Sequence, residues 1–146
     1  MSGARLAAAA RSWLGTPYQH QASLRGVGCD CLGLLRGVWR DVHGLEPEIP
    51  PPYTPDWAES QHTFAEPLLD AVRRYLDPVS DGAPRVGDVL LFRWRAHLPA
   101  KHLAIVSMSG LMIHAHDGAC VCEVPFSAWW QRHLAASFRH REEEHP

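Results

Sequence analysis

The feature that most constrains the fold is a change in hydrophobic period close to Pro84. Before this point, apolar residues recur at the three- and four-residue spacing of a helix, most clearly in the segment 31–43. After it, short apolar or alternating runs separated by glycine are typical of β-strands. Helices followed by strands predict an α+β fold, in which N-terminal helices pack on an antiparallel sheet.

The same patterns give the bounds of the individual elements. Helices are expected over Ala4–Trp13, Cys31–His43, Leu68–Leu76 and Phe126–His133, and strands over Val86–Trp94, His102–Met108, Leu111–His114, Ala119–Val124 and Ala135–Arg141. The pairs Ser109-Gly110 and Asp117-Gly118 suit tight turns, so three of the strands are predicted to form a meander.

The proline-rich stretch Leu45–Asp56 is predicted to be an irregular surface loop, because neither of its flanks could form a domain alone. The 146 residues are therefore expected to form a single domain over residues 1–146. The acidic run Glu142–Glu144 is interpreted as a solvated tail.

Charge and hydropathy exclude several classes of partner. The formal net charge is −2 and no basic stripe is present, so nucleic acid is not an expected partner. No apolar run approaches the ~20 residues of a membrane span. The apolar stretch Leu6–Ala10 is too short for a signal peptide and is followed by Arg11. We therefore expect the chain to be made in the cytoplasm without a signal peptide.

Cys31 is the best candidate nucleophile among the four cysteines, because it stands where a glycine-containing loop meets the predicted helix 31–43. Backbone N–H groups and the helix dipole favour the thiolate at a helix N-terminus. The same N–H groups could hold an oxyanion during acyl transfer. A thiolate that cleaves peptides also needs a general acid, which is usually histidine.

Two of the ten histidines have informative positions. His102 opens an apolar strand, and His114 follows twelve residues later, after one predicted hairpin turn. On adjacent antiparallel strands this spacing can bring the two rings side by side, and a polar group that orients a catalytic base is a general feature of triads. For an arbitrary cysteine and two histidines, the more common case is that each histidine is a surface or core residue with a satisfied hydrogen bond.

Five short motifs occur in an order that resembles the NlpC/P60 family. That family's pattern is G-x-P-Y, D-C-S-G-L, G-D-L-x-x-F, H-V-G-I-Y and a hydrophobic residue followed by H-A. The corresponding segments here are residues 15–18 (GTPY), 30–34 (DCLGL), 87–92 (GDVLLF), 102–106 (HLAIV) and 113–115 (IHA). Each segment is weak evidence alone, but five in order over about two-thirds of the chain are strong evidence.

The resemblance implies a papain-like fold and a cysteine peptidase that needs no cofactor and no metal. It implies that Cys31 is the nucleophile, His102 the general base and acid, and His114 the orienting residue. Tyr18 would lie beside the thiol and bind substrate or oxyanion, and Asp30 would bind a free amine of the substrate. Members typically cleave the γ-D-glutamyl bond to a diamino acid in peptidoglycan stem peptides. Leu32 replaces the family's usual serine, so bond specificity follows less directly than mechanism.

The segment Gly15–Arg40 is most similar to a phage-type branch of the family, which occurs in tailed phages and gene transfer agents. This resemblance implies that the protein is a component of a phage-like tail and contacts tail-hub or tail-tip proteins. Such a particle would carry a chain without a signal peptide to the periplasmic cell wall.

Other interpretations remain open at this stage. The protein could be a non-catalytic tail-tip assembly module, with Trp57, Trp94, Trp129 and Trp130 either anchoring interfaces or capping the core. The same thiol chemistry could also serve acyl transfer instead of hydrolysis.

The cysteines other than the nucleophile have alternatives of their own. Cys29, Cys31, Cys120 and Cys122 could hold zinc, although C-x-C is tighter than the usual ligand spacing. Cys120 and Cys122 could instead be small core residues. Cys29 is interpreted as a bystander, or as a partner that protects Cys31 in a disulfide. His114 and His116 share a strand face, but two such ligands are a weak metal signal, and His116 is interpreted as a surface or site-rim residue.

Overall fold

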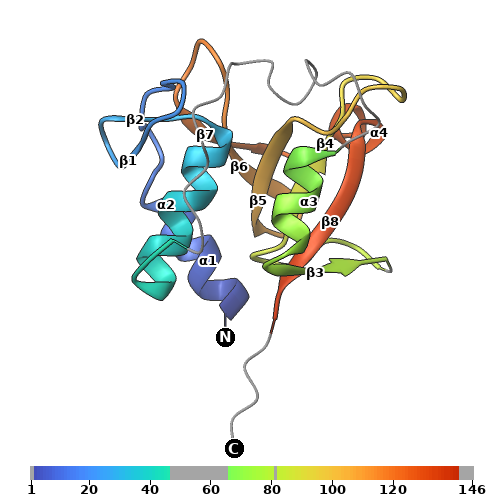
Figure 1. Cartoon of the computed structure of the whole chain (residues 1–146), viewed down its shortest axis with the longest axis horizontal. Helices are drawn as coiled ribbons and strands as arrows, with labels where there is room; N and C mark the ends of the chain where they lie inside the picture. Colours follow the sequence, from blue (N-terminus) through green and yellow to red (C-terminus); the bar gives the residue numbers. More distant parts are fainter. Residues whose placement is uncertain (1, 47–65, 81, 142–146) are drawn as a thin grey trace, which may run out of the picture.

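The computed structural model describes residues 2–46, 66–80 and 82–141 (Figure 1). The helices are α1 (Ser2–Arg11), α2 (Cys31–His43), α3 (Pro67–Arg73) and α4 (Ala128–Arg132). The strands are β1 (Ser23–Leu24), β2 (Gly28–Cys29), β3 (Leu76–Val79), β4 (Val89–Phe92), β5 (His102–Met108), β6 (Leu111–Ala115), β7 (Val121–Pro125) and β8 (Leu134–His140). Most of the proline-rich stretch, Trp57 and the acidic run Glu142–Glu144 lie outside the described residues.

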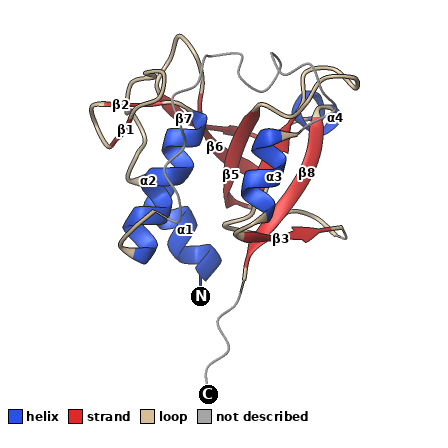
Figure 2. Ribbon diagram, in the orientation of Figure 1, coloured by secondary structure: helices blue, strands red, loops and turns tan. Residues whose placement is uncertain are grey.

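Six strands form one antiparallel sheet in the order β3-β8-β4-β5-β6-β7. Strands β4 to β7 follow one another as neighbours, and the predicted three-strand meander is β5-β6-β7. Strand β8 then returns across the sheet to lie between β4 and β3. Figure 2 shows the helices beside this sheet, so the expected α+β architecture is confirmed.

One predicted element is wrong at its end. The helix expected over Leu68–Leu76 stops at Arg73, and Leu76 begins β3. Helical spacing of apolar residues suggested a continuous helix, but Leu76 pairs with His140, 64 residues further on. Because the paired residues are far apart in the sequence, no local pattern indicates that Leu76 belongs to a strand. Pro78 is tolerated because β3 is an edge strand.

Residues alternate along the strands and so bury two separate hydrophobic clusters. Leu103 and Ile105 face α1, α2 and α3, whereas Ala104 and Val106 face the opposite side, where Trp130 of α4 packs. The helix-side cluster contains mostly aliphatic residues, including Leu6, Ala10, Leu34, Val38, Leu68, Val72 and Ile113. Burying each large aliphatic side chain contributes about 1.5–3 kcal/mol. The two clusters hold the helices and the sheet in a fixed relation at the site.

Two glycines of the sequence motifs allow backbones to approach closely. A Cβ on Gly33 of α2 would lie 1.9 Å from the carbonyl oxygen of Ala22. Gly87 has φ of +88°, and a Cβ there would lie 2.3 Å from Cα of Gly3 in α1. Asp88, beside it, is fully buried and accepts two hydrogen bonds from the Arg139 guanidinium, at 2.8 and 2.9 Å. These motif residues therefore have structural roles.

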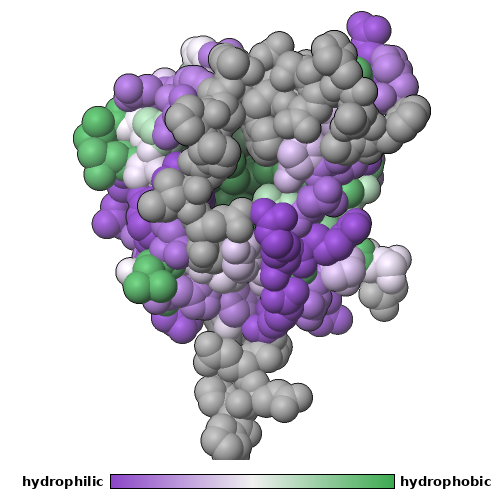
Figure 3. Space-filling view, viewed as in Figure 1, coloured by the Kyte–Doolittle hydropathy of each residue, from purple (hydrophilic) through white to green (hydrophobic). Residues whose placement is uncertain are grey.

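Much of the coloured surface in Figure 3 is hydrophilic, with separate hydrophobic patches. The most exposed large hydrophobic side chains of the described residues include Leu24, Val27 and Leu45. Among the residues that the structure describes, no helix is both long enough and apolar enough to cross a membrane.

Candidate active site

Cys31 is the first residue of α2, as the sequence predicts, and Asp30 caps that helix. One carboxylate oxygen of Asp30 accepts a hydrogen bond from the Gly33 amide at 2.7 Å. The other accepts one from the Gln21 amide at 2.8 Å. Capping satisfies an N–H group that the first turn leaves unpaired. The carboxylate thus fixes the loop before the helix and the direction in which Cys31 points.

The thiol of Cys31 lies against the main chain of β5. Its Sγ is 3.7 Å from the carbonyl oxygen of Lys101. The backbone N–H groups of Leu103 and Leu32 act on the sulfur and lower its pKa. Since Lys101 and Leu103 flank His102 in the sequence, the structure brings the sulfur to the backbone on either side of that histidine.

Burial dominates the charge state of this thiol. Desolvation raises the pKa of Cys31 to about 12, and the negative charge of Asp30 acts in the same direction. The amides of Leu103 and Leu32 lower the pKa, but by less. The amide of Leu32 at the helix start therefore favours the thiolate, as expected, but burial outweighs it and the pKa of the thiol stays raised. A helix dipole lowers the pKa of a thiol at its N-terminus, whereas burial and a nearby carboxylate raise that pKa. The thiolate is favoured only where the dipole has the larger effect.

His102 and His114 form a hydrogen-bonded pair on adjacent strands. Nε2 of His102 lies 2.9 Å from Nδ1 of His114, as the twelve-residue spacing suggested. The ring centroids are 5.1 Å apart and the planes nearly perpendicular, at 80°. Both residues are buried, with 6% and 3% of their surfaces exposed. The bond occupies Nε2 of His102, so Nδ1 is the ring nitrogen that remains for another partner.

Both imidazoles are neutral at physiological pH. Burial lowers the pKa of His102 to about 3, with further lowering by His114, His116 and Lys101. Burial lowers the pKa of His114 to about 4, and His116 adds to this effect. A neutral imidazole can accept a proton from a neutral thiol, so this pair has the form that a general base requires.

Tyr18 is positioned by an extended segment between β7 and β2. Its amide donates to the carbonyl of Ala119 at 3.0 Å, and the chain pairs with Cys29 on the other side. Burial raises the pKa of the Tyr18 phenol to about 12, and the next contributions come from Cys31 and Asp30. The phenol therefore keeps its proton, and it lies within electrostatic range of Cys31.

The Asp30 carboxylate is held between the loop and the start of α2. Only 3% of the residue is exposed, and its two oxygens accept the two amide hydrogen bonds described above. His20 adds a contact, with Nδ1 3.8 Å from the Asp30 carboxylate. The role that the structure gives to Asp30 is to hold the loop and α2 together.

Two tryptophans beside the histidine pair were not assigned to the site from sequence. The rings of Trp94 and Trp130 stack on His102, with centroids 5.4 and 5.6 Å away. The sequence alone suggests that they anchor interfaces or cap the core. No local pattern relates them to His102, because the contacts depend on how β4 and α4 fold against β5.

The remaining cysteines do not assemble with Cys31. All four are free; Cys29 is fully buried in the helix-side cluster, whereas Cys120 is exposed and Cys122 partly buried. Cys120 is thus not the small core residue that sequence suggested. Within residues 2–46, 66–80 and 82–141, no three His, Cys, Asp or Glu side chains form a group that could hold a metal. The tetrathiolate alternative has no support there. His116 is exposed, as expected of a rim residue, with its centroid 5.6 Å from that of His114.

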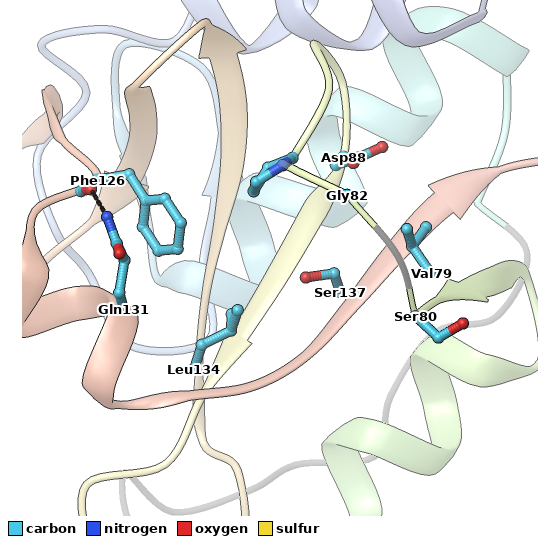
Figure 4. Close-up of a pocket in the computed structure, with 9 residues that line it drawn as sticks. Val79, Ser80, Gly82, Asp88, Phe126, Gln131, Leu134 and Ser137 are labelled. Atoms are coloured by element: carbon cyan, nitrogen blue, oxygen red, sulfur yellow. Dashed lines mark hydrogen bonds between the residues drawn. The ribbon is translucent and has the colours of Figure 1, made fainter.

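A pocket of about 300 Å³ lies elsewhere, between the β3–β4 connection and the start of β8 (Figure 4). Its lining includes Val79, Ser80, Phe126, Leu134 and Ser137. None of the five residues predicted to form the site lines it. The pocket is therefore separate from the thiol and the histidine pair.

Solved structures with similar folds are NlpC/P60 proteins. A lipoprotein-like NLP/P60 family protein from Staphylococcus aureus is 20% identical, with a TM-score of 0.64 over 97% of this chain and 42% of that chain. NlpC2 from Trichomonas vaginalis is 18% identical, with a TM-score of 0.66 over 97% and 47% of the two chains. The NlpC/p60 domain of the peptidoglycan hydrolase SagA is 24% identical, with a TM-score of 0.62 over 95% and 99%.

This chain thus spans less than half of the first two structures and nearly all of the third. Their likeness shows the papain-like fold. No curated protein matches the sequence. The sequence pattern of the NlpC/P60 family matches residues 15–139, which include Cys31, His102 and His114. This match covers most of the 146 residues, and the chain therefore belongs to the NlpC/P60 family, a family of cysteine-type hydrolases.

Proposed function

We propose that this protein is a cysteine endopeptidase that cleaves the stem peptides of peptidoglycan. The observation that carries the proposal is the position of the Cys31 thiol at the backbone flanking His102, whose ring is hydrogen-bonded to His114. A nucleophile, a base and a third group that orients the base are the parts that acyl transfer requires. The family relationship and the printed description of SagA as a peptidoglycan hydrolase support the cell wall as the substrate.

In the proposed reaction, the thiol and imidazole begin as neutral groups. His102 Nδ1 takes the Cys31 proton as the sulfur bonds to the substrate carbonyl carbon, and the carbonyl electron pair becomes an oxyanion. In this proposal Nε2–H of His102 donates the hydrogen bond to Nδ1 of His114, which leaves Nδ1 of His102 unprotonated. Backbone N–H groups at the start of α2 and the Tyr18 hydroxyl are the donors proposed for the oxyanion.

The imidazolium then gives its proton to the leaving amine as the C–N bond breaks, which leaves a thioester on Cys31. Water attacks the thioester and gives a proton to His102, and the sulfur leaves with that proton to restore the thiol. Because burial raises the pKa of Cys31, we propose that deprotonation accompanies attack. General-base assistance of this kind typically accelerates a reaction about 10²–10⁴-fold.

We propose the γ-D-glutamyl bond to a diamino acid as the bond that is cleaved. The support for it is the resemblance in the motifs around Cys31. Leu32, in place of the usual serine, is partly buried against the helix-side cluster and offers no hydroxyl to substrate. We propose that Asp30 binds a free amine of the substrate while it keeps the two hydrogen bonds that it accepts from backbone amides.

The test is digestion of purified peptidoglycan followed by mass spectrometry of the released fragments. The wild-type protein should release fragments that end at one peptide bond, and their masses name that bond. Cys31→Ala should release none, because it removes the nucleophile. Fragments from Cys31→Ala protein at the wild-type rate would refute the proposal. A Cys120→Ser protein is the matched control and should cleave as the wild type does, since Cys120 is exposed.

We also propose that a phage-like tail carries the protein to the periplasmic cell wall, with tail-hub or tail-tip proteins as its partners. The support is the resemblance of the segment Gly15–Arg40 to phage-type members. Purified particles should contain the chain and digest peptidoglycan, and particles that carry Cys31→Ala should contain it without digesting. Assembly that requires the chain, combined with no peptidoglycan cleavage by wild-type particles, would favour the assembly-module alternative.

A further inference from the structure

Trp130 contacts both histidines of the proposed catalytic pair. Its ring lies 26° from parallel to His102, at a centroid distance of 5.6 Å. The same ring meets His114 nearly edge-on, at 85° and 5.2 Å. Offset stacking and edge-to-face contacts at these distances are the arrangements that aromatic rings prefer. One side chain therefore restrains both rings of the hydrogen bond.

The position of Trp130 follows from the fold. It belongs to α4 and packs against the cluster formed by Phe92, Ala104 and Met112, on the sheet face opposite to α1 and α2. Trp94, just beyond β4, stacks on His102 as well, 28° from parallel at 5.4 Å. The centroids of Trp94 and Trp130 are 6.0 Å apart, so the three rings form a compact group.

The neighbouring residue provides a contrast. Trp129 is 46% exposed and stacks on His133, with centroids 4.0 Å apart. Its other ring contacts in the described chain are with Trp94 and Trp130. Two adjacent tryptophans in one short helix therefore have different surroundings, and only one of them stacks on the histidine pair.

Two physical consequences follow from the contacts of Trp130. A bulky ring over the His102–His114 hydrogen bond keeps water from competing for it, so the tautomer of His102 stays fixed. A tryptophan face within about 6 Å also attracts a cation, and His102 becomes a cation when it takes the thiol proton. That attraction is absent in the resting neutral site, so it stabilises the charged intermediate selectively.

We propose that Trp130 is a positioning residue, which fixes the tautomer of His102 and stabilises the imidazolium form of that ring during proton transfer. The proposal rests on the proposed function, since it assigns His102 the proton-transfer role. The charged or titratable groups that act on His102 from neighbouring elements are Lys101, His114 and His116. Of these, Lys101 carries the positive charge that opposes a charged His102, and an aromatic contact on the ring compensates for it.

The first test is ¹⁵N-edited NMR of the full chain, which reports the tautomer of His102 and the exchange of its ring N–H with water. Trp130→Leu keeps the position apolar but removes the aromatic face, Trp130→Phe keeps a smaller ring, and Trp129→Leu is the control. Wild type and Trp129→Leu should show one His102 tautomer with a slowly exchanging Nε2 proton. Trp130→Leu should exchange this proton about tenfold faster, since a tenfold change corresponds to ~1.4 kcal/mol, which lies within the range of such contacts. Trp130→Phe should fall between them.

The second test is kinetic and uses a peptide that the wild-type protein cleaves. Trp130→Leu should lower kcat about tenfold with KM changed less than about twofold, because the lost contact acts on the charged intermediate. Partial rescue in Trp130→Phe is expected. Wild-type kcat, tautomer and exchange in Trp130→Leu would overturn the proposal, as would equal effects in Trp129→Leu.

The two tests separate the inference from the proposed function. If the wild type cleaved no peptide under any condition, the proposed function would fail, while the NMR comparison would still decide whether Trp130 fixes the His102 tautomer. If Trp130→Leu did not fold, Trp130→Phe would decide the matter, with smaller changes expected in the same directions. No change in Trp130→Phe in either test would then count against the proposal.

Discussion

The two faces of the sheet present different surroundings to the two halves of the proposed site. On the helix face, α2 brings Cys31 against β5 through aliphatic packing and a close backbone approach at Gly33. On the opposite face, the histidine pair lies among the aromatic rings of Phe92, Trp94 and Trp130. The position of the Cys31 thiol thus depends on how closely the backbones of α2 and its neighbours pack. The orientation and protonation of His102 depend instead on the burial and contacts of its ring.

This difference predicts distinct responses to change. Substitutions on the helix face should act through stability and the position of α2. Substitutions on the aromatic face should act mainly through proton transfer and its pH dependence. The experiments that follow test this division.

The largest effect is expected for His102→Ala. Loss of the proposed general base should lower kcat/KM by about 10³-fold or more, while the free energy of unfolding changes far less in proportion. Hydrolysis of a stem peptide, together with urea denaturation, measures both quantities. Activity within tenfold of wild type would show that the base lies elsewhere.

Acid should destabilise the protein through the aromatic face. The folded-state pKa values of His102 and His114, about 3 and 4, lie below the ordinary value of 6.5. The unfolded chain therefore binds more protons between these values, and stability is lost as pH falls from 6.5 towards 4. We expect a loss of about 1–3 kcal/mol between pH 7 and 5.5, measured by urea denaturation. The double variant His102→Gln, His114→Gln should lose less over the same interval, and an unchanged slope would contradict this assignment.

On the helix face, Gly33→Ala should destabilise the fold by about 2 kcal/mol through overpacking. Alanine is intrinsically the better helix former by about 1 kcal/mol, so an isolated helix would gain stability. The clash decides the sign, since the new Cβ would lie 1.9 Å from a backbone oxygen that cannot rotate away. Leu24→Ala, at a side chain that is 59% exposed, is the control and should change stability by less than about 0.5 kcal/mol. A Gly33→Ala protein as stable as the wild type would show that the loop at Ala22 can move to accommodate the new Cβ at little energetic cost.

The smallest of these effects is expected for His114→Ala. It removes the hydrogen bond to His102, but Trp94 and Trp130 still restrain that ring. We expect kcat to fall about tenfold with little change in KM, because orientation is shared between the bond and the packing. Steady-state kinetics on the same peptide provides the measurement. Full activity without His114 would remove it from the mechanism.

Local patterns in the sequence were sufficient for most elements. The bounds of α2 and β5 match those expected. The signals for a helix start and for a strand lie in residues that are adjacent in the sequence, so they can be recognised locally. The His102–His114 contact could also be predicted from the sequence, since the two residues lie on strands joined by a single hairpin. Strand β3 was missed because its existence depends on pairing with β8, which local spacing does not record.

Within the candidate site, the identities of Cys31, His102, His114, Tyr18 and Asp30 came from motif order, while their environment came only from the fold. The helix start suggested a thiolate, yet burial beside Asp30 keeps the thiol neutral. Trp94 and Trp130 had no sequence signal linking them to His102. Sequence by itself determined which groups are available and on which elements they lie, because those properties are local. Tertiary structure alone decided their charge states and ring contacts, because desolvation and stacking depend on residues distant in the chain.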